Sequence, residues 1–365
     1  ARPWFRLTTP DEELADYPGV REWLSETGKL LRTLFARTNT YAALSNSYME
    51  QAVFGTYAGM CLFDFETVQH EYSFNAGEYV LAADEKGQVN TFLREFTMPV
   101  HALVQAYGLE RCSSEAQSLY RQGNWDAEVT VLQAILPNPG RDTRSSLARD
   151  KRWRSVHLQQ GAPKGLTLRE SGFDDFPVIA PRWDALPGEA YGHGPASDAL
   201  GDVRQLQAQQ EDKSFGIAMQ ARPPLALPVS MQASLDSRGI HPGMVLYGSE
   251  TIRGAYEAPL RLDFLLSDIQ DIRARIDSAL YVDLFLMLAS ANRTRMTARE
   301  VAERQEEKLL MLGPMLERQH RENLSPRIDL GFTHLLRAGL IPPPPEELAG
   351  QELKVEFVSM LAQAQ

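Results

Sequence analysis

The chain has 365 residues, 43% of them hydrophobic and 23% charged, which excludes a disulfide-stapled miniprotein and wholesale disorder. At roughly 150 residues per domain, this length predicts two or three packed units. The formal net charge of −11 repels the nucleic-acid backbone and argues against tight DNA binding. Two cysteines, Cys61 and Cys112, lack zinc-site spacing and predict buried, reduced thiols. No apolar run approaches the roughly 18 residues of a membrane span, so we expect a soluble protein.

The first half of the chain predicts a mixture of helices and strands. Apolar residues recur at helical steps over residues 18–57, which favours two helices separated near Asn39. Short apolar segments at 59–65, 68–74, 79–83 and 89–96 favour strands of one antiparallel meander. A helix at 99–107 and strand-like segments near 129–136, 153–158 and 167–169 follow, with a basic loop at 141–152 that we interpret as solvated.

The second half is mostly helical. A polar helix at 196–220 ends at Pro223, and a second helix at 263–285 carries one apolar stripe: Leu265, Ile269, Ile272, Ile276 and Leu280. The forty residues between them are punctuated by Gly and Pro, which favours small β structure. A third helix begins at Thr297, kinks at Gly313-Pro314, restarts at Ser325-Pro326 and ends at Gly339. The prolines at 342–345 predict a stiff spacer, and the fold class is α+β.

Catalytic signatures are absent from the sequence, which has no phosphate-binding loop, nucleophile elbow or zinc-binding histidine pair. Gly192-His193-Gly194 is only a fragment of a dinucleotide fingerprint. A Mg²⁺-dependent nuclease using Glu300, Glu303 and Glu307 is the alternative enzyme hypothesis, but interleaved basic residues favour a solvated, ion-paired helix face. We therefore expect no enzyme and no cofactor. A monomeric binding module is a further alternative.

Three separated stretches of the sequence carry a family resemblance. The first is 74–82 with 92–96, and the second runs from Trp183 to Pro195. The third begins at Met296 and continues through Gly313-Pro314 and Ser325-Pro326 to residues 340–345. In this order they resemble the head-to-tail connecting, or portal, proteins of short-tailed bacteriophages (podoviruses). The resemblance covers nearly the whole chain.

This resemblance implies the phage portal fold, with an α/β wing, a two-helix stem, a small β-containing clip and a long kinked helix after a tunnel loop. The implied boundaries are wing 1–187, stem helix 1 at 188–221, clip 222–262, stem helix 2 at 263–286, tunnel loop 287–296, kinked wing helix 297–340, and wing exit toward the crown 341–365. The family usually continues past residue 365 into a crown or barrel, so we expect this sequence to stop early.

The implied function is structural. Subunits would form a ring, typically a dodecamer, at one capsid vertex of the virion, after assembly in the host cytoplasm. Double-stranded DNA would pass through the axial channel during packaging and ejection. The implied partners are further copies of the chain, the terminase large subunit, tail adaptor and nozzle proteins, and capsid and scaffold proteins, with no membrane.

The resemblance also implies three groups of site residues. The tunnel loop would present to the DNA Ser290, Asn292, Arg293, Thr294 and Arg295. The clip would dock partners through Pro223, Pro224, Met231, Arg238, His241, Tyr247, Arg253 and Tyr256. Stem contacts between subunits would involve Arg204, Asp268, Asp271 and Arg275. For Arg293 and Arg295, solvated loop arginines remain the alternative. Independently of the family, the polar faces of the helices around the insert suit a ring with a wet channel.

Overall fold

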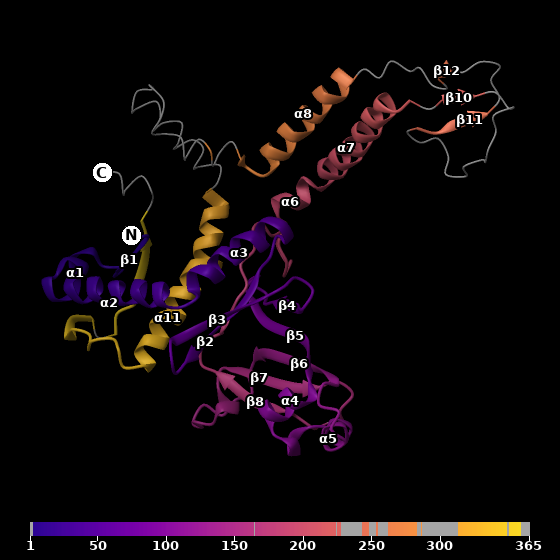
Figure 1. Ribbon diagram of the computed structural model, residues 1–365. Coiled ribbons are helices and arrows are strands. Elements are labelled where there is room, and N and C mark those ends of the chain that lie inside the picture. Colours follow the sequence, from indigo (N-terminus) through magenta and orange to yellow (C-terminus); the bar gives the residue numbers. More distant parts are fainter. Residues whose placement is uncertain are drawn as a thin grey trace. The chain divides into compact units, whose positions relative to one another are not determined.

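The structure is a computed structural model in which the chain forms two compact units (Figure 1). It describes residues 3–163, 165–223, 225–227, 243–247, 253–254, 262–282, 286, 313–348 and 350–358. The larger unit comprises Ala1–Gly194 and Leu309–Gln365, and the smaller comprises Pro195–Lys308. The smaller unit is therefore an insertion in the larger one. Both helices and sheets are present, which confirms the α+β class.

Three helices open the larger unit: α1 (Glu12–Asp16), α2 (Pro18–Arg37) and α3 (Thr40–Phe54). The predicted break near Asn39 is confirmed. The Asn39 side chain donates to the Glu71 carbonyl at 2.7 Å and accepts from the Glu71 N–H at 3.0 Å. An amide that satisfies both backbone groups of one strand residue fixes the break between α2 and α3 against the neighbouring sheet.

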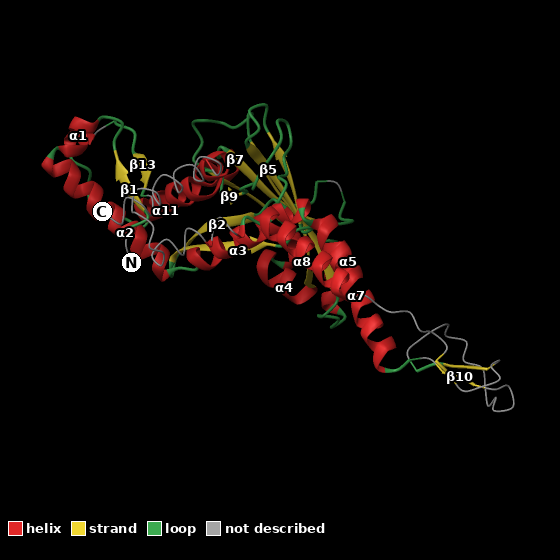
Figure 2. Ribbon diagram, turned by 90° about the horizontal axis from the view of Figure 1, so that it is seen from above, coloured by secondary structure: helices red, strands yellow, loops and turns green. Residues whose placement is uncertain are grey.

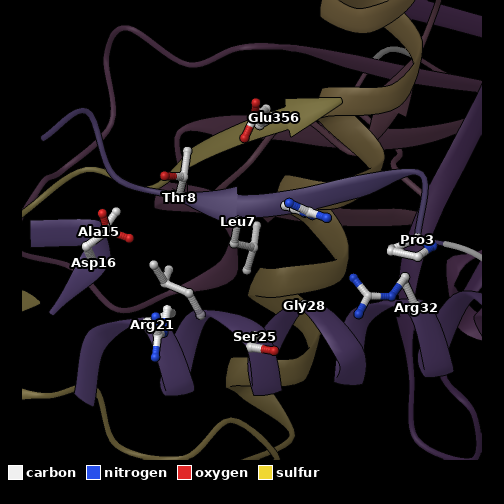
Figure 3. A pocket seen from close by; sticks show the side chains of 12 residues that line it. Pro3, Leu7, Thr8, Ala15, Asp16, Arg21, Ser25, Gly28, Arg32 and Glu356 are labelled. Carbon is white, nitrogen blue, oxygen red and sulfur yellow. The ribbon is translucent and has the colours of Figure 1, made fainter. Parts of the chain in front are cut away.

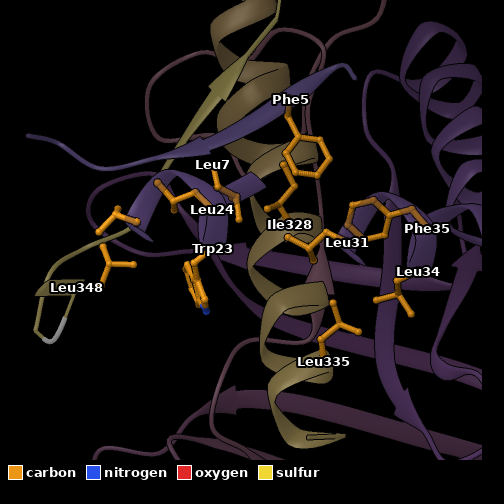
Figure 4. Close-up of a cluster of buried hydrophobic side chains, with 11 residues drawn as sticks. Phe5, Leu7, Trp23, Leu24, Leu31, Leu34, Phe35, Ile328, Leu335 and Leu348 are labelled. Atoms are coloured by element: carbon orange, nitrogen blue, oxygen red, sulfur yellow. The ribbon is translucent and has the colours of Figure 1, made fainter. Parts of the chain in front are cut away.

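A helical core joins the beginning and the end of the larger unit. Leu31 and Phe35 of α2 pack with Ile328 of α11 (Ser325–Arg337) (Figure 4). Gly331 permits this approach, because a Cβ there would lie 2.8 Å from the Phe35 ring. The two helices therefore pack closely, because the Phe35 ring lies against a position that has no side chain.

The first and last described strands pair with each other. β1 (Phe5–Thr8) is antiparallel to β13 (Lys354–Phe357), with Phe5 opposite Phe357, and Figure 2 shows the two strands side by side. Trp4 stacks on Phe357 at a centroid distance of 6.3 Å. This pairing has no counterpart in the sequence predictions, since each strand has only four residues.

Two antiparallel sheets complete the larger unit. The first has the order β3-β2-β9 and the second β4-β5-β6-β7-β8. Their bounds are β2 (Ala58–Asp64), β3 (Val68–Phe74), β9 (Val178–Ile179), β4 (Tyr79–Ala83), β5 (Val89–Pro99), β6 (Glu128–Pro137), β7 (Trp153–Gln159) and β8 (Arg169–Phe173).

The prediction of a single meander over residues 59–96 was wrong, because its four strands divide between these two sheets. The reason is a shared core: Phe74 of the first sheet and Phe92 of the second have ring centroids 5.3 Å apart in one buried cluster. Dividing the strands between two sheets lets these rings pack against each other and leave water.

Two helices cover part of the five-stranded sheet. These are α4 (Val100–Tyr107) and α5 (Ser114–Arg121), joined by the 3₁₀ turn η1 (Leu109–Arg111). Leu103, Val131 and Cys112 share their buried cluster. Cys61 and Cys112 are both buried and free, which confirms the cysteine prediction. The basic loop contains a second 3₁₀ turn, η2 (Ala148–Asp150).

The helix near the carboxyl end is continuous through Ser325. A π-helical segment, η4 (Gln319–Leu324), runs directly into α11, and Ser325 has helical dihedrals of φ −58° and ψ −47°. An α-helix begins at Ser325 with Pro326 in its first turn, as predicted, but it follows the π-helical segment directly and not a break in the chain. The predicted end is confirmed, with α11 ending at Arg337 and Gly339 at φ +69°.

The proline run then lies against α2, since Trp23 Nε1 donates to the Pro342 carbonyl at 2.9 Å. A 3₁₀ turn, η5 (Glu346–Leu348), follows it. The predicted kink at Gly313-Pro314 falls where the description of this helix begins.

The smaller unit contains two long helices and a small sheet. α6 (Pro195–Asp198) leads into α7 (Leu200–Ala221), and α8 (Leu262–Ala279) returns. Strand β10 (Leu225–Leu227) pairs in parallel with β11 (Val245–Tyr247) and antiparallel with β12 (Arg253–Gly254). The β structure expected between the helices is confirmed. α8 ends at Ala279, and Tyr281 follows with left-handed backbone (φ +58°). The end predicted for the second helix, residue 285, lies outside the described residues.

Candidate functional site

Helices α7 and α8 form an antiparallel pair within the smaller unit. Arg275 Nη2 of α8 lies 2.9 Å from Asp202 Oδ1 of α7. Further along α7, Gln209 Nε2 donates to Asp268 Oδ2 of α8. Residue numbers rise along one helix as they fall along the other, so the two contacts define the register of a helical hairpin.

Arg275 is the charged centre of this pair. Its pKa is raised by its hydrogen bond to Asp202 and by the negative charges of Asp202, Asp268 and Asp271. Its ion-pair partner is on α7, although Asp271 lies one helical turn away on α8. Of the four predicted stem residues, Asp268 and Arg275 brace the hairpin within one chain, and Arg204 is exposed on α7.

The buried seam of the hairpin is narrow. On α8, Ile269 and Ile272 are buried, while Leu265, Ile276 and Leu280 of the predicted stripe are half-buried, which confirms the stripe. On α7 the buried residues are Gly216 and Met219. Such a seam stabilises the pair only modestly, since few large side chains leave water.

Large apolar side chains lie on the outside of α7. Four of them are between 43 and 48% exposed: Leu200, Val203, Phe215 and Ile217. Leu206, one turn after Val203, is half-buried. A helix that turns aliphatic and aromatic side chains outward presents a surface suited to another protein.

In the larger unit, a buried polar network holds η4 and α11 against α3 and β3. Arg327 Nη2 lies 2.5 Å from Glu71 Oε1, and the two side chains are 3% and 0% exposed. Asn323 Nδ2 donates to Gln319 Oε1 at 2.8 Å, and Ser47 Oγ donates to Asn323 Oδ1 at 3.2 Å. Each charge and amide therefore finds a partner in a dry interior.

Tyr57 adds a further donor to this network. Its hydroxyl donates to Glu71 Oε1 at 3.3 Å, and burial together with the Glu71 charge raises its pKa. The phenol therefore remains a neutral donor to the carboxylate.

A second ion pair holds the π segment from another side. Arg182 Nη2 lies 2.7 Å from Glu322 Oε1, with side chains 6% and 12% exposed. Arg182 also donates to the Glu189 and Gly87 carbonyls, each at 2.8 Å. Two arginine–glutamate pairs thus hold η4 and α11 in place within the larger unit.

The Gly192-His193-Gly194 segment has a packing role. A Cβ at Gly194 would lie 2.6 Å from the Gln51 carbonyl, and one at Gly192 would lie 2.5 Å from the Gly55 carbonyl. The Gly192 N–H donates to Thr56 Oγ1 at 2.7 Å. The glycines therefore allow the chain to pass against the end of α3, and no phosphate-binding geometry is needed to explain them.

Many predicted site residues lie outside the residues that the structure describes. These are the tunnel-loop residues Ser290, Asn292, Arg293, Thr294 and Arg295, the clip residues Pro224, Met231, Arg238, His241 and Tyr256, and the acidic residues Glu300, Glu303 and Glu307. Of the remaining clip residues, Pro223 is exposed just after α7, Tyr247 ends β11 and Arg253 begins β12.

Two cavities in the larger unit lack catalytic side-chain sets. One of about 350 Å³ is lined by Arg6, Arg21 and Arg32 beside β1 and α2 (Figure 3), and burial lowers the pKa of Arg32. The other, of about 490 Å³, has walls that include Trp153 and Phe176. His and Cys are missing from both linings. Among the described residues there is no group of three or more His, Cys, Asp or Glu that could hold a metal ion.

Sequence reasoning missed the four residues of the two buried ion pairs: Glu71, Arg182, Glu322 and Arg327. The available signal was local. In the strand 68–74, Gln69 and Glu71 occupy the inward positions, where apolar residues are the rule. Two polar residues at inward positions indicate that buried hydrogen-bond or ion-pair partners exist, but they do not show which residues these partners are.

The described parts combine a discontinuous α+β unit, an inserted helical hairpin and exposed apolar helix faces, an arrangement suited to contacts with other protein subunits. The sequence model for the bacteriophage head to tail connecting protein matches residues 1–365, and the chain belongs to this family. No helix in the described ranges is long and apolar enough to cross a membrane.

Two curated phage proteins are similar to the chain over its whole length. It is 47% identical over 370 residues to the probable portal protein of Bordetella phage BPP-1. It is 38% identical over 371 residues to the portal protein of Salmonella phage epsilon15. Each match covers 100% of this chain and 66% of the relative, so the chain spans just under two thirds of their length. Neither relative's name supports the nuclease alternative.

Proposed function

We propose that this chain is a non-enzymatic portal subunit that forms a ring at one capsid vertex of a phage virion. Double-stranded DNA passes through the ring during packaging and ejection. Family membership and the names of both relatives support this function. The structural observation that carries it is the α7–α8 hairpin, whose exposed apolar side chains require neighbouring subunits.

The hairpin suits the wall of a channel. Its outer apolar residues offer contacts to neighbours, while Asp202, Asp268, Asp271 and Arg275 keep part of its surface polar. Each copy carries a formal net charge of −11, so a ring of twelve copies is strongly negative. DNA moving through such a channel is repelled from the wall and does not stick. An electropositive lumen in the assembled ring would overturn this part of the proposal.

The remaining assignments follow the family pattern. The wing consists of residues 1–187 and the kinked helix at 297–340, and the stem consists of α7 and α8. The clip is the segment 222–262, which contains β10, β11 and β12. Residues 287–296 form the tunnel loop, and residues 341–365 form the exit toward a crown. The clip docks the terminase large subunit during packaging and later the tail adaptor and nozzle proteins. The wing contacts capsid and scaffold proteins during assembly in the host cytoplasm.

Within the tunnel loop, Arg293 and Arg295 contact the phosphate backbone as DNA passes. Their replacement by Ala should reduce packaging, genome retention or ejection. If all three are unchanged in phage carrying both substitutions, the two arginines are solvated loop residues.

Imaging the purified protein tests the ring directly. Negative-stain images and native mass measurements should show a large ring with a central hole, whereas a monomeric module stays small. Val203→Glu should impair ring formation. The matched control, Gln205→Glu, adds the same charge on α7 without removing an apolar side chain, and rings should persist. A monomeric wild-type protein would contradict the proposed function.

A further inference from the structure

Helix α3 buries small and polar side chains and exposes large apolar ones. The residues that it buries are small or polar: Thr40, Ala43, Ser47 and Gln51. Its exposed residues include five large apolar side chains, 42 to 66% exposed, and by helical spacing four of them lie away from the buried side: Tyr41, Tyr48, Met49 and Val53. We call these four residues the α3 stripe. An isolated surface helix has the opposite arrangement.

The buried face of α3 explains this reversal. Ser47 and Gln51 belong to the polar network around Arg327, and Gln69 Nε2 donates to Thr40 Oγ1 at 2.8 Å. Hydrogen-bonding groups thus occupy the inward positions, and the apolar side chains lie outside. The helix has a single charged residue, Glu50, among its 15 residues. A solvated helix face usually carries several charges, so the α3 stripe is not adapted to water.

The five-stranded sheet has a second exposed apolar face. Phe92 and Ile135 point into the core, so the alternate residues of β5 and β6 point away from it. These outward positions carry Val80, Leu93, Leu132 and Leu158, none of which is buried. Val80 lies opposite Leu93, and Leu132 opposite Leu158, in the strand register. We call these four residues the outer sheet face.

An antiparallel sheet with one solvated face normally alternates apolar and polar side chains. At these four positions the outer sheet face departs from that rule, while Glu95 and the Arg154–Glu170 ion pair lie elsewhere on the same side of the sheet. The larger unit therefore carries two apolar faces of different shape, a ridge on a helix and a nearly flat sheet surface.

We infer that the α3 stripe of one copy packs on the outer sheet face of the next copy around the ring. The inference rests on the proposed function, because a ring formed by rotation joins two different faces of each subunit and covers both on every copy. A helix ridge lying on a sheet is a standard layer packing. A partner that binds only one of the two faces would leave the other exposed.

Charge also favours a second copy as the occupant. Copies that each carry a net charge of −11 repel one another, and they approach best where charged groups are absent. The four residues of the α3 stripe and the four of the outer sheet face are uncharged. On the same side of the sheet, Arg154 and Glu170 neutralise each other at 2.8 Å, and Glu95 lies opposite Leu132. The α3 stripe adds no charge to the contact, so apolar burial is opposed mainly by the charge of Glu95.

Chemical cross-linking of the full chain tests the pairing. The native thiols Cys61 and Cys112 are 1% and 2% exposed, so they stay unreactive in the folded protein. Met49→Cys with Leu93→Cys should give a ladder of covalent multimers when assembled rings are treated with a short bis-maleimide. Each single variant should give no product, and a mixture of the two should stop at dimers. Met49→Cys with Leu336→Cys, which moves one thiol to exposed α11, is the matched control and should give no ladder.

An assembly measurement complements the cross-link. Leu93→Glu should raise the protein concentration needed for half-assembly about tenfold, as for an interface residue of moderate weight. Leu336→Glu should leave that concentration unchanged. Far-UV circular dichroism must show that both variants are folded.

The outcomes separate the two proposals. Wild-type protein without rings overturns the proposed function. Intact rings without a ladder from the double cysteine variant overturn the pairing of the α3 stripe with the outer sheet face. Dimers from Met49→Cys alone also overturn it, because they place two α3 stripes against each other.

Discussion

Glu71 and Arg327 form an ion pair at 2.5 Å although they are 256 residues apart in the sequence. The pair joins β3 to α11, and both side chains are almost completely buried. A buried charge without its partner is far more costly than the intact pair is stabilising. Replacing only one of the two residues should therefore destabilise the larger unit more than replacing both.

Arg327→Met should lower the free energy of unfolding of the larger unit by about 3–5 kcal/mol, because it leaves the Glu71 carboxylate buried and unpaired. Urea unfolding followed by tryptophan fluorescence measures the change. The double variant Glu71→Gln with Arg327→Met should recover part of the loss. As a control, Arg275→Gln removes an exposed arginine from the α7–α8 hairpin and should have little effect. Equal effects of Arg327→Met and Arg275→Gln would contradict the assigned role.

Gly194→Ala should destabilise the larger unit by about 1–3 kcal/mol, because the added methyl group would meet the backbone at the end of α3. Thermal unfolding followed by circular dichroism provides the measurement. Gly19→Ala is the matched control in α2, where a Cβ meets nothing closer than 3.9 Å. It should be neutral or stabilising by up to about 1 kcal/mol. Similar melting temperatures for the two variants would rule out the close approach of Gly194 to α3.

Acid should destabilise the larger unit through His157. Burial, with Arg169 and Arg94 nearby, lowers the pKa of His157 from 6.5 to about 4. The unfolded chain therefore binds a proton that the folded chain does not, and stability falls as the pH decreases from about 6.5 to 4. His157→Gln cannot titrate, so its unfolding free energy should depend less steeply on pH over this range. Equal slopes for wild type and variant would contradict this account.

Glu50 should act in the opposite direction. One of its carboxylate oxygens is buried and has no hydrogen-bond partner in the described parts of the chain, and burial raises its pKa. The folded state then favours the protonated acid, so stability decreases as the pH rises through the range just above the normal pKa. Glu50→Gln should be neutral or stabilising at pH 7 and should remove this dependence. A variant less stable than wild type at pH 7 would indicate that the ionised carboxylate has a favourable partner.

Much of the secondary structure could be predicted because its signals are local. The isoleucines of α8 repeat at helical spacing, and Asn39 interrupts the helical pattern where α2 ends. The division of the meander could not be predicted, because the contact of Phe74 with Phe92 decides it across two sheets. The outward side chains of α3 follow from polar partners on β3 and η4, which no property of α3 itself reveals.

The site was less accessible to sequence reasoning than the fold. A strand with Gln69 and Glu71 at inward positions indicates a buried polar contact, but it cannot show that Arg327 supplies the partner. Likewise, Asp271 and Arg275 at a four-residue spacing suggest an ion pair within α8. In the structure Arg275 forms its ion pair with Asp202 of α7, because the antiparallel register of the two helices places that carboxylate 2.9 Å away.

The pairing of β1 with β13 has a consequence for the timing of biosynthesis. β1 ends at Thr8 and its partner begins at Lys354, so translation at roughly 5–20 residues per second separates their emergence by tens of seconds. During that interval the nascent chain cannot close the core in which Phe5 packs near Ile328. Ribosomes that stall before residue 354 therefore release chains whose larger unit lacks its closing strand. Only polypeptides translated past that residue can form the β1–β13 pair.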